Sequence, residues 1–152
     1  MDWLLDLLTN PFSLTAVTAW FLAQLMKVII NLVVQKKLVW ERLIGDGGMP
    51  SGHSATVASL ATITALLQGT GSFAFAIALI LAIVVCHDAM GVRQETGKQA
   101  MVLNELIEIL ESKDLLPEVK LKELVGHTPL QVLMRILTGV ATAFGMYYFL
   151  FI

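Results

Sequence analysis

The chain has 152 residues, enough for one domain, and 57% of them are hydrophobic while only 14% are charged. A mean hydropathy of +0.77 excludes an ordinary soluble composition. The net charge of −2 gives no reason to expect a nucleic-acid partner, and the single cysteine, Cys86, excludes a disulfide framework. We therefore predict an integral protein of a bacterial-type plasma membrane, surrounded by membrane lipids.

Four apolar stretches approach the roughly 20 residues that a helix needs to cross a bilayer. The first holds one charge, Lys27, and the fourth holds one, Arg135, which we expect to pair with lipid headgroups or a neighbouring acid. The predicted fold is all-α: a polytopic helical bundle of about four transmembrane spans in a single membrane domain, 1–152. Because four spans make a thin bundle, a homodimer stays open as the oligomeric state. The predicted spans are about 13–34, 51–67, 73–90 and 129–151.

A more polar segment, 94–125, separates the third and fourth predicted spans. Apolar residues recur in it at helical spacing, for example Val102, Leu106 and Leu110, and glutamates lie on another face. This pattern predicts an amphipathic helical insertion that packs on the protein or lies at the membrane interface.

Basic residues gather in the segments that follow the first and third spans. Three lie in 35–49 and five lie in 91–128. With four spans, both segments are on one side, and the positive-inside rule makes that side cytoplasmic. Several polar residues are then expected near the cytoplasmic face: Arg42, His53, Asp88, Arg93 and His127.

The stretch GGMPSGH, 47–53, interrupts the apolar pattern at the start of the second span. A helix that begins there presents backbone N–H groups and the positive end of its dipole, which together suit an anion. Nearby lysines and arginines would neutralise a phosphate, and two histidines could divide nucleophilic and acid roles. No carboxylate cluster or Cys/His spacing indicates a bound metal.

Three motifs in order resemble a known family. PSGH, 50–53, matches the central motif of the type 2 phosphatidic acid phosphatase superfamily, which includes vanadium-dependent haloperoxidases. HTPLQVL, 127–133, resembles the HYPSDVL pattern that carries the superfamily's nucleophilic histidine. Together with DAMGVRQETGKQAMVLNE, 88–105, the set is similar to the divergent branch of small membrane proteins related to acid phosphatases and vanadium-dependent haloperoxidases.

The resemblance implies roles for individual residues. His127 would attack phosphorus and form a phosphohistidine, and His53 would protonate the departing alkoxide and then activate water. Ser51 and the Gly52 amide would hold phosphate oxygens. Arg93 resembles an arginine of the superfamily, whose upstream lysine and arginine would correspond to cations among Lys27, Lys36 and Arg42.

The chain also departs from the superfamily pattern. Gln131 stands where an aspartate would orient the nucleophilic histidine, and Asp88 is the carboxylate that could supply the missing charge. The whole insertion separates Arg93 from His127, and the upstream Lys-x6-Arg-Pro motif is absent. A glutamine can hydrogen-bond an imidazole, but it does not stabilise imidazolium as a carboxylate does.

The predicted function is metal-independent hydrolysis of a lipid phosphate by a histidine nucleophile. The substrate classes are phosphatidic acid, phosphatidylglycerophosphate and polyprenyl (pyro)phosphate. No cofactor is expected, although vanadate could occupy the pocket as a phosphate mimic. The alternative is a non-catalytic lipid-phosphate binding or transport protein, which the loss of the aspartate favours and the presence of both histidines opposes.

Overall fold

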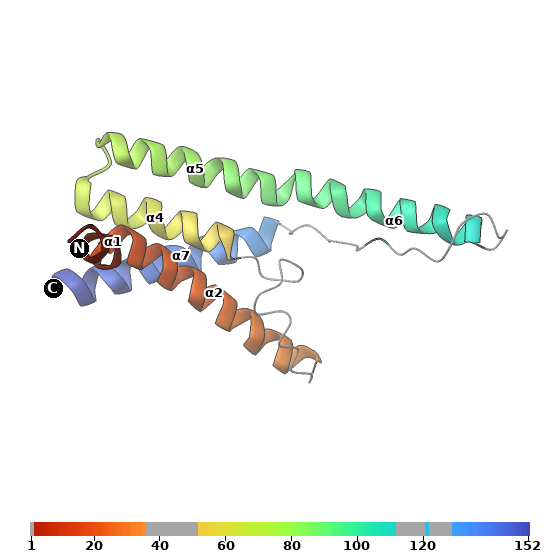
Figure 1. The fold of residues 1–152 in the computed structure, drawn as a ribbon, viewed down its shortest axis with the longest axis horizontal. Helices are drawn as coiled ribbons and strands as arrows, with labels where there is room; N and C mark the ends of the chain where they lie inside the picture. Colours follow the sequence, from red (N-terminus) through yellow and green to blue (C-terminus); the bar gives the residue numbers. More distant parts are fainter. Residues whose placement is uncertain (1, 36–51, 112–120, 122–128) are drawn as a thin grey trace.

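The computed structural model describes residues 2–35, 52–111, 121 and 129–152. Every element in these ranges is an α-helix, which confirms the all-α expectation (Figure 1). The helices are α1 (Asp2–Thr9), α2 (Pro11–Gln35), α4 (His53–Gln68), α5 (Phe73–Met90), α6 (Val92–Glu111) and α7 (Pro129–Phe151).

Helix α4 is the centre of the bundle and packs against α2, α5 and α7. Small side chains let the neighbouring helices approach it closely. The hydroxyls of Ser59 and Thr62 donate to the carbonyls of Thr56 and Ala58 in the same helix, both at 2.8 Å. Their hydrogen-bonding capacity is therefore satisfied without water. The buried residues of α4 are Ser54, Ala55, Val57, Ala58, Ser59, Ala61, Ile63 and Thr64.

Within the described residues, three helices are long and apolar enough to cross a membrane. They cover Pro11–Ile30, Phe73–Glu111 and Leu130–Phe151. The second predicted span, 51–67, corresponds to α4, whose 16 residues reach only about 24 Å against the roughly 30 Å of a hydrocarbon core. The expected four spans are therefore represented by three candidate spans around a shorter central helix.

The helices alternate in direction. In Figure 1, α2 and α5 run one way, and α4 and α7 run the other. The end of α2, the start of α4, the end of α5 and the start of α7 consequently lie at one end of the bundle, which we call the polar end. At the opposite end, Gly69 has a φ of 80° and Ser72 Oγ accepts the Phe75 N–H at 3.2 Å, which ends α4 and begins α5.

The packing faces of α2 and α7 are narrow stripes of small residues with one cation each. On α2, the buried positions recur every fourth residue: Thr15, Ala19, Ala23 and Lys27. On α7, they are Val132, Arg135, Gly139 and Ala143. A side chain at Gly139 would meet the backbone of Ala55 on α4, so α4 and α7 touch backbone to backbone there.

Helix α6 continues α5 after a break at Gly91 and extends beyond the bundle (Figure 1). It covers most of the predicted insertion 94–125, of which 112–120 and 122–125 lie outside the described residues. The chain returns to α6 at Leu121, because the Asn104 amide donates to the Leu121 carbonyl and accepts the Leu121 N–H, both at 2.9 Å. These two bonds explain why a polar side chain can be buried in this helix.

Candidate functional site

A small apolar cluster joins three helices just beneath the polar end. It consists of Val57 of α4, Cys86 and Ala89 of α5, and Val132 of α7, all buried. Each lies within about one turn and a half of the helix end at which the polar residues occur. Burial of these side chains therefore fixes the start of α4, the end of α5 and the start of α7 relative to one another.

Three polar residues discussed in the sequence analysis lie within about one helical turn of this cluster. His53 begins α4, one turn before Val57, and its side chain is exposed. Asp88 lies in the last turn of α5 and is half-buried. Gln131 lies in the first turn of α7, directly before Val132, and is also half-buried. The structure thus brings His53, Asp88 and Gln131 to the same end of the bundle, which the sequence led us to expect of His53 and Asp88.

Gly52 directly precedes α4 and lies against the ring of Trp20 on α2. A Cβ at this position would lie 2.7 Å from Trp20 Cδ1, so the ring of Trp20 holds the start of α4 against α2. Gly52 has αR dihedral angles, with φ −68° and ψ −20°, and it has no side chain with which to cap the helix. The anion-binding role expected of this helix start stays a prediction.

Lys27 is one of the two buried cations among the described residues of the bundle. Its side chain is 2% exposed and continues the packed stripe of α2. It lies two turns beyond Trp20, about 10 Å further toward the polar end. Burial of an ammonium group is costly unless its charge is compensated, so Lys27 is an ionisable group held inside the bundle.

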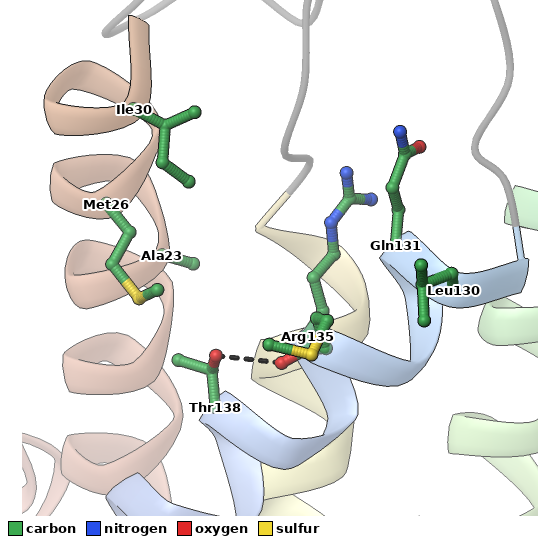
Figure 2. Close-up of a pocket in the computed structure, with 8 residues that line it drawn as sticks. Ala23, Met26, Ile30, Leu130, Gln131, Arg135 and Thr138 are labelled. Atoms are coloured by element: carbon green, nitrogen blue, oxygen red, sulfur yellow. Dashed lines mark hydrogen bonds between the residues drawn. The ribbon is translucent and has the colours of Figure 1, made fainter. Parts of the chain in front are cut away.

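Arg135 is the second buried cation, and it lines a cavity of about 320 Å³ between α2 and α7. It is 4% exposed, and its Nε, Nη1 and Nη2 find no hydrogen-bond partner in the part of the chain that the structure describes. The guanidinium and the Gln131 amide point the same way, toward the start of α7 (Figure 2). The expected pairing of Arg135 with a neighbouring acid is therefore not found among the described residues.

Other predicted site residues are not placed. Lys36, Arg42, Ser51 and His127 lie outside the described residues. For Arg93, the structure places the backbone in the first turn of α6 and leaves the side chain undescribed. In the described ranges, no three His, Cys, Asp or Glu side chains are grouped to hold a metal ion.

Arg135 was not among the site residues expected from the sequence. The signal was present, because an ionisable residue inside an apolar span is usually functional. However, no motif of the resembled superfamily contains this position, and only the packing of α7 reveals that the side chain faces the bundle.

The molecule is thus an all-helical membrane protein with buried cations and a histidine at one end. Residues 8–142 match the divergent PAP2 family, and the chain belongs to this family. It is 40% identical over 157 residues to the "Uncharacterized membrane protein YuiD" of Bacillus subtilis (strain 168), covering 95% of this chain and 99% of that protein. No solved structure matches the chain. The resemblance noted in the sequence is therefore confirmed.

Proposed function

We propose that the protein is a metal-independent lipid phosphate phosphatase whose polar end faces the cytoplasm. The observation that carries the proposal is the burial of two cations, Lys27 and Arg135, toward the same end of the bundle as the start of α4, where the PSGH motif ends. Positive charge and free N–H groups are what a phosphate needs. Membership of the divergent PAP2 family supports a phosphatase-related function.

In the first step, an imidazole nitrogen of His127 attacks phosphorus and forms an N–P bond. The bond between phosphorus and the lipid oxygen breaks, and protonated His53 gives its proton to that oxygen, so that the lipid leaves as a neutral alcohol. Lys27 and the backbone N–H groups at the start of α4 stabilise charge on the phosphoryl oxygens. Gln131 accepts the N–H on the other imidazole nitrogen of His127 and orients the ring.

In the second step, water attacks the phosphohistidine. His53, now neutral, takes a proton from this water, the N–P bond breaks, and inorganic phosphate leaves with His127 restored. Asp88 lies at the same end as His53 and would stabilise the protonated imidazoles that form during the cycle.

A lipid is the substrate class that suits this position. Helix α4 is shorter than the hydrocarbon core is thick, and α2 and α6 extend past its start (Figure 1). A substrate could therefore keep its chains among lipids while its phosphate reaches the start of α4. Phosphatidic acid, phosphatidylglycerophosphate and polyprenyl (pyro)phosphate all have this form.

A non-catalytic lipid-phosphate binding or transport protein is the second candidate, and Gln131 favours it. A neutral amide in place of a carboxylate weakens the nucleophile, whereas it leaves an anion pocket intact. The two candidates differ in one covalent species, since only the phosphatase forms a phosphohistidine.

The test is to trap that species with a lipid phosphate labelled with ³²P at the phosphoryl group. Rapid alkaline quenching of the wild type is expected to give acid-labile label on the protein, and His127→Ala is expected to give none. His87→Ala is the matched control, because His87 is an exposed histidine that the mechanism does not use. Label that is absent from the wild type, or that persists in His127→Ala, would remove the proposed nucleophile.

A further inference from the structure

We propose that Arg135 binds the phosphate of a lipid substrate directly, and that the cavity between α2 and α7 holds the adjoining hydrocarbon chain. The inference deepens the proposed function by assigning a phosphate ligand and a chain site. It concerns binding, so it can be tested separately from hydrolysis.

The environment of Arg135 requires an anion. Its three guanidinium nitrogens are buried and lack partners among the described residues, and no described Asp or Glu side chain is buried. An uncompensated buried charge is strongly destabilising, whereas a phosphate satisfies a guanidinium through paired hydrogen bonds. A bound phosphate would therefore provide the partner that these residues do not.

The register of α7 against α4 brings Arg135 to the predicted phosphate site. Gly139 lies against the backbone of Ala55, and the two helices run in the same direction (Figure 1). About one turn back along each helix, roughly 4.5–6 Å, leads from Gly139 to Arg135 and from Ala55 to Gly52. Arg135 is thus level with the start of α4, where the PSGH motif ends.

The lining of the cavity suits an amphiphilic ligand. Its lining is Ala23, Met26, Ile30, Leu130, Gln131, Met134, Arg135 and Thr138. The Thr138 hydroxyl donates to the Met134 carbonyl at 2.9 Å (Figure 2), so the guanidinium and the Gln131 amide are its principal polar groups. Its volume of about 320 Å³ falls within the range of ligand pockets. Charge at one end and hydrocarbon at the other fit a lipid phosphate better than free phosphate.

The experiment compares the binding of two phosphonates that no phosphatase can hydrolyse. Hexadecylphosphonate is presented at a fixed mole fraction in detergent micelles, and methylphosphonate is dissolved in water. Binding is followed by tryptophan fluorescence, to which Trp20 beside Gly52 contributes, and by the shift in the thermal unfolding midpoint. Arg135→Met is expected to raise the dissociation constants of both phosphonates by about thirtyfold or more. Its unfolding midpoint without ligand is expected to equal or exceed that of the wild type, because an uncompensated charge has been removed.

A second variant tests the chain site alone. Thr138→Phe would fill the cavity, so it is expected to weaken the binding of hexadecylphosphonate while leaving the binding of methylphosphonate unchanged. Leu137→Phe is the matched control, because Leu137 is an exposed neighbour that does not line the cavity. If Arg135→Met does not fold, Arg135→Gln removes the charge and keeps hydrogen-bonding capacity.

The outcomes separate this inference from the proposed function. Wild-type binding of hexadecylphosphonate by Arg135→Met or Arg135→Gln would overturn the role of Arg135. Equal losses of both phosphonates in Thr138→Phe, or no loss of either, would overturn the chain site. A wild type that binds through Arg135 but releases no phosphate from any lipid would keep the inference and remove the phosphatase.

Discussion

Replacing Gly139 by alanine is expected to lower the thermal unfolding midpoint in detergent by several degrees. The new Cβ would collide with the Ala55 carbonyl oxygen and lie 3.0 Å from the Ser59 nitrogen. Both are backbone atoms of the central helix, so neither can rotate away, and α7 must shift off α4. Overpacking of this kind typically costs about 1–3 kcal/mol.

Gly145→Ala is the matched control for this prediction. Gly145 lies in the same helix, and an added Cβ there meets nothing within 4 Å. Because alanine favours a helix over glycine by about 0.8–1 kcal/mol, this variant should be as stable as the wild type or more so. Equal effects of the two substitutions would show that the contact between α4 and α7 is not as close as described.

His53→Ala is expected to lower the rate of phosphate release from an alkyl lipid phosphate by about 10²–10⁴-fold, the usual contribution of a general acid or base. Burial of Val57, one turn later, fixes the start of α4 and should keep the fold intact. The rate is measured with wild type, His53→Ala and the control His87→Ala, alongside their thermal unfolding midpoints. Retained activity in a folded His53→Ala protein would remove His53 from the mechanism.

The role of His53 as an acid makes a sharper prediction. A phenolate leaving group needs no proton, so His53→Ala should still form the phosphohistidine from an aryl phosphate. The intermediate should then accumulate, because no base activates water for the second step. An equal loss of phosphohistidine formation from aryl and alkyl substrates would indicate that His53 binds phosphate instead of transferring protons.

Much of the helical architecture follows from local sequence. Helices α5 and α7 cover the ranges 73–90 and 129–151 that the apolar pattern indicates. Their boundaries carry clear local signals, a Gly-Thr-Gly-Ser turn before α5, Gly91 after it and a Thr-Pro start for α7. The break at Gly91 likewise separates the apolar helix from the amphipathic one.

The position of α4 could not be predicted in the same way. Its sequence is apolar and rich in small residues on every face, so no hydrophobic stripe indicates a preferred partner. Close approaches decide its position instead, at Gly52 against Trp20 and at Gly139 against Ala55. Both join residues far apart in the chain, and periodicity carries no information about them.

Part of the candidate site was likewise predictable from the sequence, and part was not. The order of motifs and the alternating helices were enough to predict that His53 and Asp88 share one end. Arg135 was not predicted as a site residue, because its orientation depends on the register of α7 against α4. A charge within an apolar span signals function, but the span alone does not tell whether that charge faces lipid, solvent or the bundle.

Phosphate release from a panel of lipid phosphates is the most direct test of the account. Purified protein in detergent is incubated with phosphatidic acid, phosphatidylglycerophosphate and polyprenyl (pyro)phosphates, with EDTA present throughout. Hydrolysis by a histidine nucleophile predicts release from at least one of them, undiminished by EDTA and lost in His127→Ala. Activity that EDTA abolishes would contradict the metal-independent mechanism. If the protein releases no phosphate from any lipid in the panel but still binds hexadecylphosphonate, it is a binding or transport protein instead.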